Sequence, residues 1–336
     1  MSDLQLSLLN DFQRGFPLTP RPFDGIAQRL GLDLEALLDT LRRLTREGAI
    51  SRVGAVFRPN RVGVSTLAAM AVPEGRLDEV ARLVSARPEV NHNYEREHRF
   101  NLWFVATAAN PAQLAQALHD IEQQTGLAAM RLPMVQDYHI DLGFDLRRSV
   151  GLTDRHQQKA APSRALELDA LDYALVEAIQ EGLPLVARPY AEVAAFIGTS
   201  EADVLIRLGR LLDHGVIKRL GIVVRHHELG FRANAMAVWN IPDRLVDEFG
   251  RCVGASGLVN LCYQRPRRLP EWPYNLFCMI HGKDRDAVLE HLDHLRDQCG
   301  LTEFPCEVLF SKRRFKQTGA RYLAAQPKAV AEAETT

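Results

Sequence analysis

The densest group of chemically active side chains lies in one short segment, residues 92–104. It reads His-Asn-Tyr-Glu-Arg-Glu-His-Arg-Phe-Asn-Leu-Trp-Phe and combines histidines, arginines and large aromatic rings. A histidine exchanges protons near neutral pH, a guanidinium binds a carboxylate through two parallel hydrogen bonds, and an aromatic ring packs on a flat ligand. This combination indicates a site for a flat ligand that carries several carboxylates. A nucleic acid fits the same description, so the segment alone leaves both ligands open.

The segment is predicted to form two adjacent strands and the turn between them. Side chains alternate along a strand, so His92, Tyr94 and Arg96 should share one face of the sheet. His92 is the first candidate for a proton donor and His98 the second, because the histidine pKa lies near neutrality. Tyr94 joins them as a candidate for a catalytic role. The candidates for ligand binding in this half are Arg52, Arg58, Arg96, Asn101 and Trp103.

A second segment, residues 261–277, repeats the arginines and aromatic rings of the first but holds no histidine. Leu261 stands where His92 stands in the first segment, and Arg267 stands where His98 stands. The candidates for ligand binding in this half are Arg219, Arg225, Tyr263, Arg265, Arg267, Trp272 and Asn275.

These two segments belong to an internal duplication in which residues 4–144 recur, in diverged form, at residues 169–315. A constant offset of 167 matches Gly15 to Gly182 and continues through the first third of each copy. The offset then becomes 169, which matches Tyr94 to Tyr263, and finally 174, so the second copy carries small insertions. A repeat of this length indicates two similar structural units.

Each copy opens with a pattern typical of a winged helix-turn-helix. In the first copy, apolar residues at helical spacing predict helices near 4–12, 23–30 and 33–47, and an apolar strand interrupted at Gly54 follows at 49–57. Three helices and a β-ribbon are the elements of that motif. Arg52 and Arg219 end the motif, so pairing with a helix C-terminus is their alternative role.

The rest of each copy has the order βαββαβ of a ferredoxin-like unit, an antiparallel sheet with two helices on one face. In the first copy the last strand is expected at residues 129–140. The fold class is therefore α+β, with a tandem duplication. The predicted boundaries are 1–60 and 168–228 for the winged helix-turn-helix units, 61–145 and 229–318 for the ferredoxin-like units, 146–167 for a linker, and 319–336 for a loose tail.

We do not expect these helix-turn-helix units to bind DNA. The third helix would read the major groove with its first residues, but carboxylates stand there and the basic residues come late. The chain has a net charge of −1, whereas DNA-binding domains carry an excess of positive charge. The carboxylates concerned are Asp33, Glu35, Asp39, Glu201 and Asp203.

Composition is that of an ordinary globular protein, with 46% hydrophobic and 25% charged residues. No apolar run is long enough to span a membrane, and residues 1–10 are amphipathic rather than signal-like. Five cysteines, an odd number without a CxxC pair, predict reduced thiols in the cytoplasm and no structural zinc site. Arginines make up 35 of the 41 basic residues, which fits either carboxylate recognition or a GC-rich genome.

The chain resembles the siroheme decarboxylases of the Lrp/AsnC-like superfamily, in particular the fused NirD–NirL type. One departure is Leu261, where related second halves can carry a histidine. The resemblance covers nearly the whole chain. It rests on RVGAVF (52–57), HNY (92–94) with Arg96 and His98, and NLWF (101–104) in the first copy, and on CYQRPR (262–267), WPYNLF (272–277) and MIHG (279–282) in the second.

The resemblance implies that carbon dioxide is lost from the C12 and C18 acetate side chains of siroheme. The product would be 12,18-didecarboxysiroheme, on the route to d1-type haem in denitrifying bacteria or to haem b by another path. The iron-tetrapyrrole is then the substrate, and no separate cofactor is expected. His92 or His98 could alternatively be an axial ligand to the substrate iron.

An arginine that grips the reacting carboxylate would stabilise the ground state and slow the reaction. The arginines should therefore hold the spectator carboxylates, with Arg96 and Arg265 as the preferred clamps. The reacting acetate is expected in a drier corner, with Trp103 and Phe104 as candidates for its wall or for core positions.

Two other functions remain open from the sequence. One is an Lrp/AsnC-type transcription regulator with a small effector, and the other is a haem or siroheme carrier. The two halves are expected to pair within one chain. A homo-oligomer, or an assembly with other proteins of d1-type haem synthesis, is a further possibility.

Overall fold

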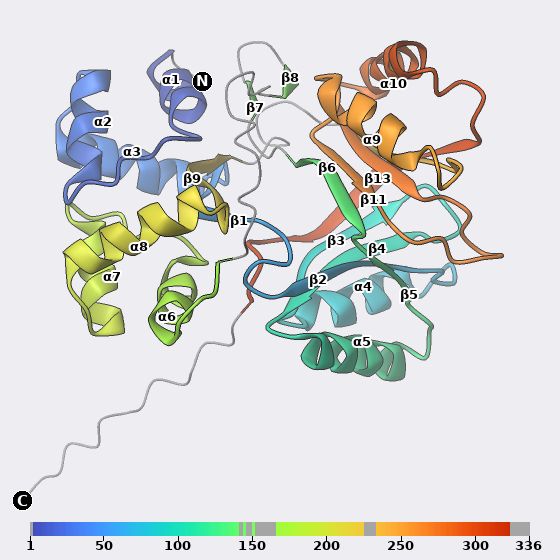
Figure 1. Ribbon diagram of the computed structural model, residues 1–336, viewed down its shortest axis with the longest axis horizontal. Helices are drawn as coiled ribbons and strands as arrows, with labels where there is room; N and C mark the ends of the chain where they lie inside the picture. Colours follow the sequence, from blue (N-terminus) through green and yellow to red (C-terminus); the bar gives the residue numbers. More distant parts are fainter. Residues whose placement is uncertain (1–2, 141–143, 146–149, 152–165, 225–232, 323–336) are drawn as a thin grey trace, which may run out of the picture.

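The computed structural model describes residues 3–140, 144–145, 150–151, 166–224 and 233–322. Figure 1 shows two bodies, a helical one that contains both helix-turn-helix units and a sheet-containing one that contains both ferredoxin-like units. The two copies are therefore sorted by type of unit rather than by order along the chain. None of the helices in these ranges is long and apolar enough to cross a membrane.

The helical body forms where the apolar spacing predicts helices. Asp33 caps the third helix by accepting a hydrogen bond from the Ala36 amide at 2.7 Å. The leucines of that helix, among them Leu37 and Leu41, enter one core shared by both copies. The elements are α1 (Asp3–Asp11), α2 (Pro22–Leu30), α3 (Leu34–Arg46) and β1 (Ile50–Phe57), and then α6 (Ala170–Ile179), α7 (Pro189–Ile197), α8 (Glu201–Asp213) and β9 (Ile217–Val224).

The β-ribbon of this body is built from one strand of each copy, because β1 pairs antiparallel with β9. Gly54 lies opposite Gly221, and β1 runs through Gly54 without the predicted interruption. A Cβ at Gly54 would lie 2.9 Å from the Gly182 Cα, and one at Gly221 would lie 2.3 Å from the Gln13 carbonyl oxygen. Glycine is needed at both positions because the backbones of the two copies approach so closely.

The sheet-containing body has the predicted βαββαβ order in each copy. The difference is that the last strand of each copy also pairs with the other copy. The first copy supplies β2 (Val64–Met70), α4 (Leu77–Ala86), β3 (Val90–Arg96), β4 (Leu102–Ala108), α5 (Pro111–Thr125), β5 (Met130–Pro133) and β6 (Gln136–Ile140). The second copy supplies β10 (Ala233–Trp239), α9 (Val246–Ala255), β11 (Leu261–Gln264), β12 (Leu276–Gly282), α10 (Arg285–Cys299) and β13 (Cys306–Gln317). Between the copies lie two short strands, β7 (Phe144–Asp145) and β8 (Val150–Gly151), which pair with each other.

The prediction of one last strand over 129–140 is wrong, because that stretch is divided between the two copies. β5 pairs with β2 of its own copy, whereas β6 pairs with β11 of the second copy. Pro133 has no amide hydrogen to continue the ladder, so pairing breaks there. β13 makes the corresponding exchange as one strand, pairing with β10 and then with β3. The result is a nine-stranded sheet in the order β5-β2-β4-β3-β13-β10-β12-β11-β6.

Exchange of the last strands brings the inner faces of the two ferredoxin-like units together. Trp103, Trp272, Phe277 and Leu309 lie in one apolar cluster that both copies build. The helix pairs α4 and α5, and α9 and α10, cover the outer sides (Figure 1). The inner face of β3 consequently meets the second copy, and Arg96 at its end donates to the Leu309 carbonyl at 3.0 Å.

Two further predictions are corrected. Cys252 and Cys299 form a disulfide that joins α9 to the end of α10, so reduced thiols were the wrong expectation for these two. Packing of the two helices brings the Cα atoms of the two cysteines to 5.8 Å, within disulfide range. The sequence separation of the two cysteines is 47. The tail predicted from residue 319 is also partly packed, because Tyr322 is only 6% exposed.

Candidate functional site

His92, Tyr94 and Arg96 form a row along β3, as strand alternation predicts. The rings of His92 and Tyr94 are stacked with centroids 6.4 Å apart. The guanidinium carbon of Arg96 lies 5.8 Å from the Tyr94 ring centroid. Asn93 points the other way and donates to the Ala81 carbonyl of α4 at 3.0 Å. The sheet thus presents a histidine, a phenol and a guanidinium side by side.

His92 is held by its neighbour, is partly buried and lies near the positive charge of Arg52. Its Nδ1 lies 2.9 Å from the Asn91 side-chain oxygen. Burial, and next the positive charge of Arg52, lower the pKa of His92 to about 4. The ring is therefore neutral at pH 7 without a ligand. An anionic ligand placed beside it would oppose the effect of Arg52 and raise the pKa towards the range of a useful acid.

His98 is fixed by the fold at both ring nitrogens. Nδ1 accepts a hydrogen bond from the Phe100 amide at 2.9 Å, and Nε2 lies 2.9 Å from the Glu307 carboxylate. Its ring meets the Trp272 ring edge-on at a centroid distance of 5.4 Å. Burial lowers the pKa of His98, and Glu307 acts in the opposite direction. Since neither nitrogen is available in this arrangement, we favour His92 over His98 as proton donor.

Two buried arginines, Arg96 and Arg265, occupy equivalent places in the two copies without a carboxylate partner among the described residues. Arg96 is 7% exposed and donates to the Leu309 carbonyl at 3.0 Å, and Arg265 is 8% exposed and donates to the Leu132 carbonyl. Burial lowers the pKa of each guanidinium to about 10. A buried cation without a counter-ion is costly, so both positions are suited to binding an anion.

The second copy has a corresponding row, with Leu261 and Tyr263 on β11 and Arg265 just after it. It differs from the first row in having no histidine. Arg265 lies over the Tyr263 ring with 4.9 Å between guanidinium carbon and centroid, as Arg96 lies over Tyr94. Leu261 faces Met279 across the strand pair. The second copy therefore lacks a histidine at the position of His92, the first candidate for a proton donor.

Several candidates for ligand binding are engaged by the protein itself. Asn101 bonds through both ends of its amide to the Val72 backbone, at 2.9 Å each, and Asn275 does the same to Ile241. Arg219 donates to the Gln13 carbonyl at 2.7 Å, between the helix-turn-helix units. These are structural positions.

The remaining candidates lie in different surroundings. Arg267 binds side-chain and backbone oxygens of the loop at residues 240–243. Trp103 and Trp272 are buried in the apolar cluster that both copies build, whereas Phe104 belongs to the core under the helices of the first copy. Trp103 donates to the Phe100 carbonyl at 2.6 Å. Arg58 follows β1 and is partly buried, and Arg225 lies outside the described residues.

An open cavity of about 500 Å³ lies on another side of this region. Its lining includes Arg96 and His98 but not His92, and it contains Glu74, Asp78 and Glu95. Glu97 adds a fourth carboxylate, against three cationic side chains in the lining. Two of these, Lys312 and Arg313, are already paired with Glu95, so Arg96 is the one cation of the lining left for a polyanion among the described residues. The row on β3 is the better candidate site, because it combines Arg96 with His92 and Tyr94.

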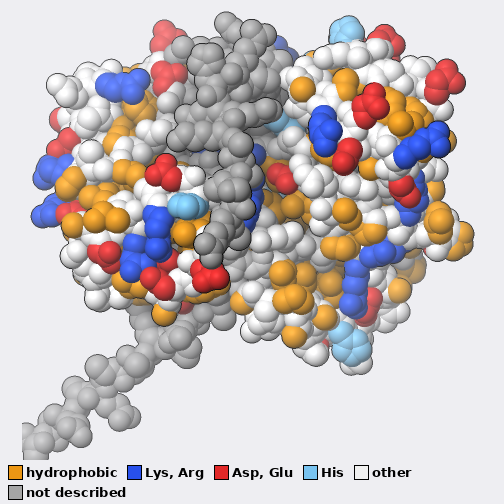
Figure 2. Space-filling model, viewed as in Figure 1, with side chains coloured by type: hydrophobic (Ala, Val, Ile, Leu, Met, Phe, Trp, Pro, Cys, Tyr) orange, Lys and Arg blue, Asp and Glu red, His pale blue; other side chains and the backbone are white. Residues whose placement is uncertain are grey.

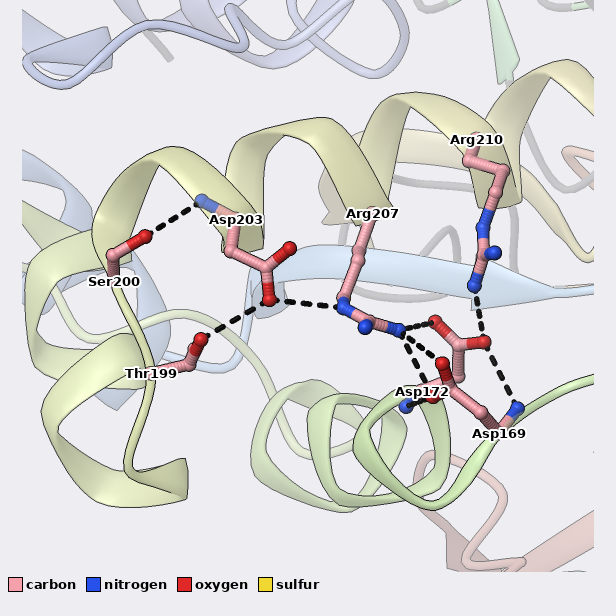
Figure 3. A network of polar contacts seen from close by, with 7 residues as sticks. All are labelled: Asp169, Asp172, Thr199, Ser200, Asp203, Arg207 and Arg210. Carbon is pink, nitrogen blue, oxygen red and sulfur yellow. Dashed lines mark hydrogen bonds and ion pairs between the residues drawn. The ribbon is translucent and has the colours of Figure 1, made fainter.

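In the second helix-turn-helix unit, two arginines of α8, Arg207 and Arg210, form internal ion pairs (Figure 3). Arg207 of α8 lies 2.8 Å from Asp169, 2.9 Å from Asp172 and 3.0 Å from Asp203. Arg210 also pairs with Asp172, which is fully buried. Figure 2 shows acidic and basic side chains interspersed over the face that it displays of the helical body. This arrangement fits the prediction that DNA is not the ligand.

Replacing Arg207 by methionine should lower the free energy of unfolding by about 2–3 kcal/mol, because buried Asp172 loses a charge-assisted hydrogen bond. Arg207 also holds the pKa values of Asp169 and Asp203 below their usual range. Their stabilising contribution is present above the unfolded-state pKa, about 4, and disappears as pH falls through the lower folded-state value. Urea unfolding at several pH values should show that the free energy of unfolding of the variant falls less steeply with decreasing pH than that of the unaltered protein.

The matched control is Arg21→Met, which removes an exposed pair with Asp24 and should change stability little. Equal effects of the two substitutions would show that the network around Asp172 contributes no more than a surface pair.

Sequence reasoning missed the residues that close the site from the end of the second copy. Gln317 lies opposite His92 in the strand pairing, and the Thr318 amide donates to the Asn91 carbonyl at 2.8 Å. The sequence signal was weak, since the only large aromatic residue in the predicted tail is Tyr322.

Comparison with known proteins agrees with this architecture. Residues 6–50 and 172–218 match a family model described as a siroheme decarboxylase NirDL-like HTH domain, and residues 61–139 and 228–316 match an AsnC-like ligand binding domain. The chain is 45% identical to the siroheme decarboxylase NirDL subunit of Paracoccus denitrificans over 95% of this chain and 97% of that protein. It is 31% identical to a siroheme decarboxylase of Hydrogenobacter thermophilus, over 94% of each.

Two solved structures are similar over nearly the whole length. A crystal structure of the siroheme decarboxylase NirDL has a TM-score of 0.69 and 27% identity, covering 96% of this chain and 95% of that one. A second crystal structure shows NirDL in complex with an iron-uroporphyrin III analogue and has a TM-score of 0.67 and 28% identity, covering 95% and 93%.

Proposed function

Because this chain belongs to the siroheme decarboxylase NirDL family, we propose that it removes carbon dioxide from siroheme. The observation that carries the proposal is the row on β3, where neutral His92 and the buried guanidinium of Arg96 flank Tyr94. Arg96 has no carboxylate partner within the part of the chain that the structure describes. Siroheme is flat and carries many carboxylates, which matches the arginines and rings of both copies. A related NirDL has been crystallised with an iron-uroporphyrin III analogue, which supports a porphyrin-sized ligand.

We propose that the reacting groups are the acetate side chains at C12 and C18, and that the product is 12,18-didecarboxysiroheme for d1-type haem. In each step the bond between the methylene and the carboxylate carbon breaks, and its electron pair passes into the pyrrole system. A proton then adds to the methylene carbon to give a methyl group, and carbon dioxide leaves. Each step consumes one proton and no electrons. The macrocycle is itself the electron acceptor, so no separate cofactor enters the proposal.

Within this scheme His92 is the proton donor. It becomes competent when the substrate carboxylates raise its pKa. Arg96 of the first copy and Arg265 of the second hold spectator carboxylates of the substrate. The reacting acetate then lies where no arginine stabilises its charged form, which favours its loss. A location in the cytoplasm stays a prediction.

The direct test is anaerobic incubation of the purified protein with siroheme, followed by mass spectrometry of the tetrapyrrole. We expect the successive loss of two carbon dioxide units. A transcription regulator would leave siroheme unchanged and bind duplex DNA with a steep salt dependence. A carrier would shift the Soret band without forming product. Either result in place of the mass loss would refute the proposal.

A further inference from the structure

The last described residues of the second copy, 318–322, cross from the sheet to the helical body beside His92. We name this segment the C-terminal strap. β13 pairs with β3 as far as Gln317, which lies opposite His92. The Thr318 amide then donates to the Asn91 carbonyl at 2.8 Å, and the Thr107 hydroxyl donates to the Arg321 carbonyl at 3.0 Å. The start of the strap is thus fixed to β3 through Thr318, and Arg321 near its far end is held to β4.

The other end of the strap is fixed to the helical body. The Tyr322 amide donates to the Gln180 side chain at 3.0 Å, and its ring meets Phe57 edge-on with 6.0 Å between centroids. Arg321 forms an ion pair with Glu181. Tyr322 is 6% exposed and belongs to the core of the helix-turn-helix units. A terminal segment normally stays loose unless such contacts hold it, so this anchoring is substantial.

Between its two ends the strap lies against the groups that surround His92. A Cβ at Gly319 would lie 2.9 Å from Arg52 Nη1, so the strap backbone passes directly over that guanidinium. Burial raises the pKa of Tyr322 to about 12, while the charge of Arg52 acts in the opposite direction, so the two groups are near each other. Asn91, whose backbone bonds to the strap, is the same residue whose side chain bonds to His92.

We propose that the C-terminal strap is a wall of the His92 site, supplied by the second copy, which positions Asn91 and Arg52 and limits the access of water to the partly buried histidine. The proposal rests on the proposed function for the role of His92, but not for the wall itself. Water exclusion strengthens electrostatic interactions inside a site and holds reacting groups in place. The strap residues are positioning residues. One active site then needs both copies, because the acid comes from the first copy and its cover from the end of the second.

The first test measures access to His92 without any turnover. Diethylpyrocarbonate modifies accessible neutral histidines, and mass spectrometry of peptides separates His92 from exposed His294, which is the internal reference. Shortening the chain after Gln317 should raise the rate of His92 modification about tenfold relative to His294, because an anchored segment no longer covers it. Shortening it after Tyr322 keeps the strap and is the matched control, for which we expect no change.

Two point variants keep the test valid if the shorter chain fails to fold. Tyr322→Ala removes the anchor and should raise the His92 modification rate severalfold, whereas Tyr322→Phe keeps the packed ring and should leave it near that of the unaltered protein. If Tyr322→Ala and the chain ending at Gln317 both leave His92 as protected as before, the strap is no wall of this site.

The second test measures the consequence for the reaction. Tyr322→Ala should lower kcat for siroheme about tenfold or more and change the Kd for iron-uroporphyrin III less than threefold, because the strap positions the acid rather than the carboxylate clamps. An unchanged kcat would overturn the positioning role. If the unaltered protein does not decarboxylate siroheme at all, the proposed function fails, while the modification experiment still decides whether the wall exists.

Discussion

Replacing His92 by alanine should lower kcat for siroheme decarboxylation by about 10²–10⁴-fold, the usual contribution of a positioned general acid. The affinity for the porphyrin should change little, because the arginines and aromatic rings of both copies remain. Single-turnover assays by mass spectrometry, together with a Soret titration for binding, separate the two quantities. His92→Gln is the matched variant, since it keeps a hydrogen-bonding group beside Asn91 but has no acidic proton to deliver.

The pH dependence gives an independent test of the same role. The acid must be protonated, and the pKa of His92 without ligand is about 4, so kcat/KM should fall as pH rises above that value. Bound carboxylates raise the pKa, so the fall in kcat should come at higher pH than the fall in kcat/KM. The facing groups Arg52, Tyr94 and Tyr322 do not titrate here, since burial raises the pKa of both tyrosines and arginine stays cationic.

Two outcomes would contradict this role. A His92→Ala variant with normal kcat would assign the proton to another group, with His98 as the next candidate. A variant that binds porphyrin much more weakly but has an unchanged kcat at saturation would make His92 a binding residue, for example an axial ligand to the substrate iron.

Replacing Arg96 or Arg265 by methionine should weaken porphyrin binding by about 10–100-fold each, because each loses a charge-assisted contact worth about 1.5–3 kcal/mol. The free energy of unfolding of the ligand-free protein should fall much less than the free energy of binding does. A buried guanidinium without a counter-ion is unfavourable, and an apolar side chain of similar length removes that cost. Thermal unfolding should therefore show little change without ligand and a smaller rise in Tm when iron-uroporphyrin III is added.

Arg251→Met provides the control for this prediction, since Arg251 is an exposed arginine on α9 whose side chain is 75% accessible. It should affect neither binding nor Tm. If Arg96→Met and Arg265→Met destabilise the ligand-free protein strongly while binding is unchanged, both arginines serve the fold through Leu309 and Leu132 rather than the substrate.

Local periodicity in the sequence was sufficient to predict the units and the orientation of the central row. A constant offset between the copies follows from their common descent, and it predicted two helix-turn-helix and two ferredoxin-like units. Alternation along a strand placed His92, Tyr94 and Arg96 on one face, because this alternation is a property of the extended backbone itself. Helix limits such as Asp33 and Gly31 were also readable, since a cap acts on neighbouring residues.

Only the tertiary structure decided which candidates are engaged elsewhere and what encloses the row. Asn101 and Arg219 have the residue types of a binding site, but distant backbone groups satisfy them. Residues 129–140 are divided between the two opposite edges of one sheet. This division, the Cys252–Cys299 bond and the path of the strap to Tyr322 depend on contacts between segments far apart in the chain. Such pairing is set by the packing of whole units, which no local pattern records. The sequence therefore determined which groups could act, and the exchange of strands between copies determined that one site uses both.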